Sequence, residues 1–267
     1  MVKFSSDSVS ILRWKQEALR GLNAKAVSDP GLLAVKEGRL EDLKKLIKHE
    51  NWDPKKVVDR NGCNALHWAA GSGYVGICIY LCEECGVEID DLRGKKGMRR
   101  HALHWAARNG HISVLEWMIL VKGVNVNVQT TDGTASIHFA AYSGQIETCK
   151  WLINVARCDV NIKNSFGCNA SQWCAINGNI PLMVYFKQCG LDFLILNSNG
   201  HSAVHKAAIK GNIDACRWLL DPMGGGLSHG KHCLPDKEGW TPHRLALDNG
   251  HIELATFLLR IKDEYTC

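Results

Sequence analysis

Ala65-Leu66-His67-Trp68-Ala69-Ala70 is the first clear copy of a short phrase that returns along the chain. Five further copies, some of them degraded, are Ala102-Leu103-His104-Trp105-Ala106-Ala107, Ser136-Ile137-His138-Phe139-Ala140-Ala141, Ser171-Gln172-Trp173-Cys174-Ala175, Val204-His205-Lys206-Ala207-Ala208 and Thr241-Pro242-His243-Arg244-Leu245-Ala246. Successive copies lie 33 to 39 residues apart. Self-similarity at such a period predicts a repeat protein, in which each unit packs mainly against its neighbours.

The phrase resembles the T-P-L-H-x-A signature of the ankyrin repeat, a unit of about 33 residues with a β-turn and two antiparallel helices. The resemblance covers about residues 30 to 260. It implies an all-α repeat solenoid, an ankyrin stack of about seven helix-turn-helix units with β-turn fingers. The expected units lie near 30–58, 59–92, 93–130, 131–163, 164–196, 197–235 and 236–260.

Glycine marks the expected end of the first helix of each unit, because it tolerates the left-handed backbone that ends a helix. These glycines are Gly38, Gly73, Gly110, Gly144, Gly178, Gly211 and Gly250. Between units, the segments 130–134 and 236–240 contain Asp-Gly and Glu-Gly steps, which suit tight turns. The resemblance makes these turns the projecting fingers of the stack.

The two ends of the chain differ from the repeats. Within residues 1–29, a helical apolar pattern is formed by Ile11, Leu12, Trp14, Ala18, Leu19 and Leu22. We expect an amphipathic helix that caps the first unit, and the alternative is a helix that binds a partner. Residues 261–267 are expected to be a C-terminal tail.

Equivalent positions form columns along the repeats, and their residue types predict burial. One column holds Cys78, Leu115, Cys149, Met183, Cys216 and Ala255, and we predict that it is buried and apolar. An aromatic column, interpreted as core rather than as a cofactor site, holds Tyr80, Trp117, Trp151, Tyr185, Trp218 and Phe257.

Another column follows the recurrent histidine and holds Trp68, Trp105, Phe139, Trp173 and Lys206. Two interpretations of it stay open. Its side chains pack against the neighbouring repeat, or they are half buried and face the groove, since the position accepts both tryptophan and lysine.

The histidine column itself comprises His67, His104, His138 and His205. Equivalent side chains of adjacent repeats lie about 10 Å apart, roughly a helix-packing distance. Zinc needs its ligands at about 2.0–2.1 Å around one point, so a shared metal is disfavoured. The resemblance implies instead that these histidines hydrogen-bond neighbouring backbone turns.

Composition excludes several classes of protein. The net charge of +5 is well below the bias of a dedicated nucleic-acid binder, and no apolar run approaches the roughly 18 residues of a membrane span. The polar N-terminus has no apolar signal core. Twelve cysteines without a signal peptide indicate free thiols in a reducing compartment. We therefore expect a monomer that is cytoplasmic and, as an open alternative, also nuclear.

The sequence contains only weak matches to motifs for catalysis or for binding a cofactor or a metal. Gly226-Leu227-Ser228-His229-Gly230 fits the G-x-S-x-G pattern of hydrolases, but it lies in a glycine-rich insertion that we interpret as flexible. Two sets of potential metal ligands are weak: Cys78, Cys82 and Cys85, and His229, His232 and Cys233. We predict no enzymatic activity, no cofactor and no metal.

The most distinctive candidate site is basic. Residues 92–101 form the inter-repeat segment of the 37-residue interval and hold five basic residues within eight positions. We interpret this basic finger either as a solvated turn or as a contact for acidic side chains or phosphates. The candidate partner-binding residues are Arg93, Lys95, Lys96, Arg99, Arg100, Trp68, Trp105 and Trp240.

Ankyrin repeats are overwhelmingly protein-interaction modules, so the resemblance implies a scaffold or adaptor. A rigid concave surface would present the basic finger to an acidic or phosphorylated protein partner whose identity the sequence leaves open. The alternative is binding of nucleic acid or of anionic lipid headgroups through the same finger, which would weaken steeply with salt.

Overall fold

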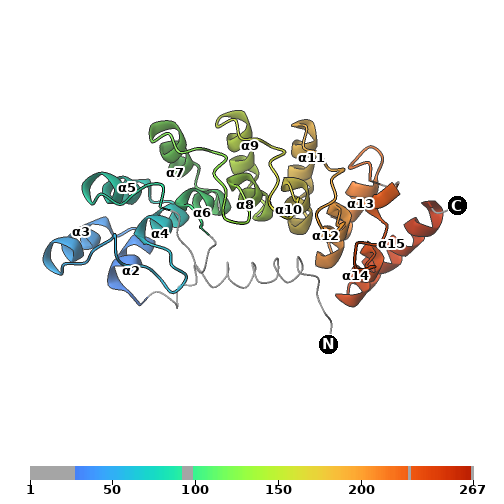
Figure 1. Ribbon diagram of the computed structural model, residues 1–267, viewed down its shortest axis with the longest axis horizontal. Coiled ribbons are helices and arrows are strands. Elements are labelled where there is room, and N and C mark those ends of the chain that lie inside the picture. Colours follow the sequence, from blue (N-terminus) through green and yellow to red (C-terminus); the bar gives the residue numbers. More distant parts are fainter. Residues whose placement is uncertain (1–27, 92–98, 228–229, 266–267) are drawn as a thin grey trace. The chain divides into compact units, whose positions relative to one another are not determined.

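The computed structural model describes residues 28–91, 99–227 and 230–265 of the 267-residue chain. These residues form fourteen α-helices, α2 to α15, which follow one another as helix-turn-helix pairs (Figure 1). Within the described ranges there is no strand, and an isolated antiparallel bridge joins Gln129 and Ala135. The all-α repeat fold predicted from the phrase is confirmed. The expected N-terminal helix lies outside the described residues.

Backbone contacts divide the chain into two compact units, which we describe separately. Unit 1 comprises the described residues of Met1–Ser136 together with Asn154–Arg157. Its helices are α2 (Pro30–Lys36), α3 (Leu40–His49), α4 (Ala65–Ser72), α5 (Val75–Ile79), α6 (Ala102–Asn109) and α7 (Ile112–Glu116). A π-helical turn continues α5 at Tyr80–Glu84 and another continues α7 at Trp117–Val121.

Unit 2 comprises Ile137–Ile153 and the described residues of Cys158–Cys267. Its helices are α8 (Ser136–Tyr142), α9 (Ile146–Asn154), α10 (Ala170–Asn177), α11 (Ile180–Gln188), α12 (Ala203–Lys210), α13 (Ile213–Leu220), α14 (Pro242–Asp248) and α15 (Ile252–Tyr265). The first residue of α8 and the last of α9 fall in unit 1. The first helices α10, α12 and α14 contact one another in order, and α11 contacts α13 (Figure 1).

Local chemistry explains where the first helices begin and end. Asn64, Asn169, Ser202 and Thr241 cap α4, α10, α12 and α14 with a side-chain oxygen that accepts a backbone N–H. Gly73 follows α4 with a left-handed φ of +83°. A Cβ there would lie 2.5 Å from His111 Nδ1, so both the backbone and the close approach require glycine.

The column that follows the histidine is fully buried. Trp68, Trp105, Phe139, Trp173 and Lys206 are between 1% and 5% exposed. Of the two interpretations left open by the sequence, packing against the neighbouring repeat is therefore correct, and a half-buried, groove-facing column is wrong. Lys206 is 1% exposed, so the presence of a lysine in this column does not indicate an exposed position. Its four-carbon stem takes the place of the aromatic rings of the other repeats.

The aromatic column of the second helices lies closer to the surface than predicted. Trp117 is buried, whereas Tyr80, Trp151, Tyr185, Trp218 and Phe257 are half-buried. Three of the rings lie under a cationic side chain, as where Lys122 Nζ is 5.8 Å from the centroid of Trp117. The deep core position is the next residue along, which is Leu81, Met118, Leu152, Phe186, Leu219 or Leu258.

The cysteine-containing column is buried, as predicted. Cys78, Cys149 and Cys216 are 0% exposed, and Leu115, Met183 and Ala255 take the same position in other repeats. The cysteines of the described residues are free thiols. Burial raises the pKa of the Cys63 thiol to about 12, so this thiol stays protonated at neutral pH.

No described helix has both the length and the apolar composition that crossing a membrane requires.

Candidate partner-binding site

Five inter-repeat turns share one geometry, and we call them fingers 2, 4, 5, 6 and 7 after the helix pair that each precedes. They are Asp59–Cys63, Thr130–Thr134, Asn164–Cys168, Asn197–His201 and Asp236–Trp240. In each finger the first backbone N–H donates to the fifth carbonyl, at 2.9–3.0 Å. The first side chain also accepts the fifth N–H, at 2.8–3.0 Å. These bonds close the turns that the sequence predicted at 130–134 and 236–240.

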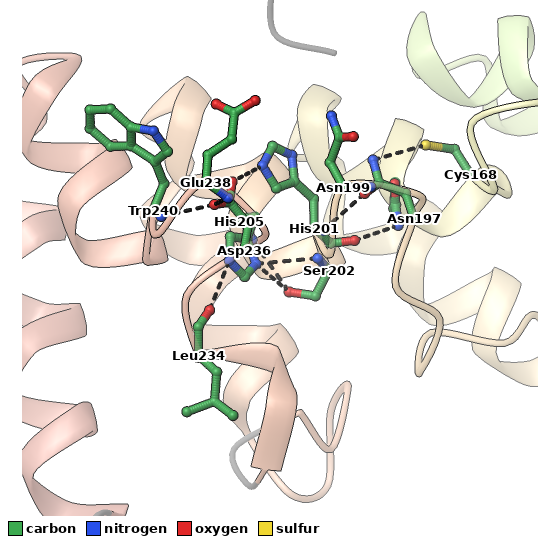
Figure 2. Close-up of polar contacts among 11 residues, drawn as sticks. Cys168, Asn197, Asn199, His201, Ser202, His205, Leu234, Asp236, Glu238 and Trp240 are labelled. Carbon is green, nitrogen blue, oxygen red and sulfur yellow. Dashed lines mark hydrogen bonds and ion pairs between the residues drawn. The ribbon is translucent and has the colours of Figure 1, made fainter. Parts of the chain in front are cut away.

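Finger 7 illustrates the arrangement (Figure 2). Asp236 Oδ1 accepts the N–H groups of Glu238 and Trp240 at 2.9 and 2.8 Å, and its Oδ2 lies 2.5 Å from His201 Nε2. Both side chains of this His–Asp contact are at most 1% exposed. One carboxylate therefore closes its own finger and also joins that finger to finger 6.

The recurrent histidines hydrogen-bond the backbone ahead of the next repeat, as the resemblance implied. In unit 1, His67 and His104 Nε2 lie 2.8 and 2.9 Å from the carbonyls of Arg100 and Val128. In unit 2, the matching bonds are His138 Nε2 to Ile162 O, at 3.0 Å, and His205 Nε2 to Leu234 O, at 3.1 Å. The histidine column is thus structural.

Gln172 takes the place of this histidine in α10 and fulfils the same function. Its Nε2 donates to the His201 carbonyl at 2.9 Å, so an amide can replace the imidazole. Burial lowers the pKa of His104 to about 3, and burial together with His201 lowers that of His205 to about 3. Both rings are therefore neutral at physiological pH, so that Nδ1 can accept a backbone N–H, from His101 in His104 and from Ser202 in His205.

The basic finger is described only at its C-terminal end. Arg93, Lys95 and Lys96 lie outside the described residues. Arg99 is exposed and has a left-handed φ of +39°, whereas Arg100 is only 6% exposed. The Arg100 guanidinium carbon lies 5.3 Å from the Trp105 ring centroid, and that of Arg108 lies 5.7 Å from it. Arg100 is therefore part of the packing around Trp105 and not a surface contact.

Burial also separates the three candidate tryptophans. Trp68 and Trp105, at 1% and 4% exposed, offer a partner almost no surface. Trp240, in unit 2, is half-buried, and the Arg244 guanidinium carbon lies 4.6 Å above its ring centroid. From the sequence alone, Arg244 was only part of the last copy of the recurrent phrase. The signal that sequence reasoning missed was an arginine four residues after a finger tryptophan in the last repeat.

The glycine-rich insertion is more constrained than the sequence suggested. Gly225 N–H donates to the Trp218 carbonyl at 2.7 Å, and Leu227 N–H donates to the Leu219 carbonyl at 2.8 Å. A Cβ at Gly224 would lie 2.2 Å from the Trp218 carbonyl oxygen. Residues 224–227 therefore close the end of α13 through backbone hydrogen bonds. Ser228 and His229 of the hydrolase-like motif lie outside the described residues.

Within the parts of the chain that the structure describes, no group of three or more His, Cys, Asp or Glu side chains could hold a metal ion. Cys78 is buried, and Cys82 and Cys85 are half-buried on the same helical segment. Burial raises the pKa of Cys82 to about 11, which disfavours the thiolate that zinc binds. The second set, which includes His229, is only partly described.

The family model described as ankyrin repeats (3 copies) matches residues 31–130, 103–194, 137–227 and 172–266. These overlapping matches extend over all the described helix pairs. None of the curated proteins matches the chain.

Proposed function

The chain belongs to the ankyrin-repeat family, and from that membership we propose that it is a non-enzymatic scaffold or adaptor for a protein partner. The family fold is typically a non-catalytic interaction domain, so a protein ligand is the expected partner class. We further propose that the partner is acidic or phosphorylated and that it contacts the basic finger.

The hydrogen-bonded fingers are the observation that carries this proposal. Each of the five fingers is closed by its own backbone and by its first side chain. A surface that is already ordered loses little conformational entropy when a partner docks, so more of the contact energy appears as affinity. Exposed fingertip residues such as Ser165, Ser198 and Lys237 can then vary without disturbing the fold.

The cationic character of the proposed site rests on Arg99 among the described residues, and on Lys95 and Lys96 from the sequence. Lysine and arginine side chains favour carboxylates and phosphates through charge-assisted hydrogen bonds. Arg100 is left out of the site because its guanidinium packs on Trp105. Trp68 and Trp105 are left out because they are buried.

A charge-matched pair of variants tests the proposal. The first replaces Lys95, Lys96 and Arg99 with alanine, and the control replaces Lys45, Lys48 and Lys56, three exposed lysines of unit 1. Binding is measured by fluorescence anisotropy against an array of acidic and phosphorylated peptides, with RNA and anionic vesicles as competing ligands.

We expect the first variant to lose at least tenfold in affinity for its best peptides, while the control stays within twofold of wild type. Equal losses in both variants would show a general charge effect and contradict a defined site. Tighter, strongly salt-dependent binding to RNA or to vesicles would favour the alternative function.

A further inference from the structure

Fingers 5, 6 and 7 of unit 2 contact one another in a repeating way. The N–H of the second residue of finger 6, Ser198, donates to the carbonyl of the third residue of finger 5, Phe166, at 2.8 Å. The equivalent bond links Lys237 N–H of finger 7 to the Asn199 carbonyl of finger 6, at 3.0 Å. Each finger therefore offers one backbone acceptor to the finger that follows.

Side chains repeat the same contact. The first residue of each incoming finger meets the fifth residue of the preceding one: Asn197 Nδ2 lies 3.6 Å from Cys168 Sγ, and Asp236 Oδ2 lies 2.5 Å from His201 Nε2 (Figure 2). The incoming backbone also approaches closely, since a Cβ at Gly200 would lie 3.4 Å from Asp236 Cα. The structure thus contains two examples of one finger receiving another.

In fingers 5 and 6, the following finger contacts the third and fifth residues, and it comes close to the fourth, as at Gly200 of finger 6. We call these three positions the receiving edge of a finger, and finger 7 has the same edge at Glu238, Gly239 and Trp240. Within the described part of the chain, no group donates to the Glu238 carbonyl, and a Cβ at Gly239 would meet nothing within 4 Å. Trp240, the fifth residue, is half-buried. The fifth residues of the other described fingers are buried, namely Cys63, Thr134, Cys168 and His201.

Arg244 sets the chemistry of this edge. It takes the position of the recurrent histidine, but it is exposed, and its guanidinium stacks on Trp240. A guanidinium that lies over an aromatic face still has N–H groups along its outer edge, and these can form a fork for a carboxylate. Lys237 and Glu238 are both exposed on finger 7, so their charges offset each other and leave Arg244 to favour an acidic ligand.

We propose that the free edge of finger 7 binds an acidic turn of the protein partner. The first residue of that turn is aspartate, and its carboxylate pairs with Arg244 beside Trp240. The N–H of the following residue donates to the Glu238 carbonyl, as Lys237 N–H does to Asn199. This inference rests on the proposed interaction function and names the chemistry of one partner segment.

The test uses a fluorescein-labelled cyclic peptide that displays Asp-Lys-Glu-Gly, the turn that finger 7 offers to finger 6. Two readouts are the anisotropy of the peptide and the NMR shift of the Trp240 indole N–H, assigned with a Trp240→Phe variant. We expect saturable binding that moves this indole signal. Replacing the peptide aspartate with alanine, or Arg244→Gln in the protein, should each weaken binding at least tenfold.

Arg260→Gln, which removes an exposed arginine from α15 of the same unit, is the matched control and should leave binding unchanged. The Lys95, Lys96 and Arg99 alanine variant should also bind the peptide normally, so failure of the basic-finger proposal is distinguishable from failure here. An unmoved Trp240 signal, or equal weakening by Arg260→Gln, would overturn the inference. A dimer in sedimentation that Arg244→Gln dissociates would also overturn it, because the edge would then belong to a second copy.

Discussion

Fingers 6 and 7 have the same backbone hydrogen bonds but different surroundings. The fifth residue of finger 6, His201, is 0% exposed and contacts Asp236 of the next finger. The fifth residue of finger 7, Trp240, is half-buried under Arg244 of its own repeat. The difference shows that a finger is closed by its own residues, whereas its fifth side chain is buried by its successor.

The largest expected effect comes from removing the fifth side chain of each finger. His201→Ala leaves Oδ2 of the buried Asp236 carboxylate without its imidazole partner, and the loss of one partner by a buried polar group costs about 3 kcal/mol. Trp240→Ala removes a half-buried ring on which no described finger packs, and we expect this to cost about 1 kcal/mol. Urea denaturation of both variants measures the difference, and similar costs would refute the comparison.

The pH dependence of stability gives a second test of the difference between the repeats of fingers 6 and 7. The pKa of His205 is about 3 in the folded state, because of burial and its neighbours His201 and Lys206, and about 6.5 when unfolded. Between these two pH values the unfolded chain binds more protons than the folded chain. The stability that the neutral His205 contributes is therefore fully present above pH 6.5 and is lost as the pH falls below it. The loss is at most about 1.4 kcal/mol per pH unit, or about 2 kcal/mol between pH 6.5 and 5.

His205→Gln supplies the control for this pH dependence. Gln172 already makes the equivalent backbone bond in α10, so the variant is expected to fold and to stay within about 1 kcal/mol of wild type at pH 7. Its stability should fall less steeply between pH 6.5 and 5. The free energy of unfolding is measured by urea denaturation at each pH. If it falls with pH as steeply in His205→Gln as in wild type, His205 does not set the pH dependence. Arg244→Gln, at the same position of the last repeat, should leave the slope unchanged.

The recurrent phrase was enough to predict the helix pairs, their terminal glycines and the buried cysteine-containing column. A period identifies which positions are equivalent, and residue type then predicts burial when the whole column is apolar. Tight turns were also predictable, because Asp-Gly and Glu-Gly steps have strong local preferences. These features depend on short-range chemistry that a single sequence contains.

The depth of the aromatic columns was not predictable in this way. Trp68 and Trp151 both belong to recurring aromatic columns, yet Trp68 is 1% exposed and Trp151 is half-buried. Their order of depth depends on how each helix rotates toward its neighbour, which periodicity does not specify. Lys206 was misjudged for a related reason, since its charged end suggested exposure while its long stem fills a core position.

The candidate site was predictable in part. Trp240 was found as a finger aromatic, whereas its partner Arg244 belongs to the helix that follows. Arg100 was assigned to the surface because charge runs usually are solvated, yet its guanidinium packs on Trp105. The contacts between successive fingers depend on side chains some 30 residues apart, such as His201 and Asp236, and no local pattern encodes that pairing.

Native-state hydrogen exchange of Ser198 and Lys237 tests most directly whether the fingers form a preordered surface. Both amides lie in turns, and each donates to the preceding finger, at 2.8 and 3.0 Å. We predict that both exchange at least a hundredfold more slowly than an unstructured peptide amide and that His201→Ala accelerates Lys237 more than Ser198. Exchange of both amides at the unprotected rate would contradict a preordered surface.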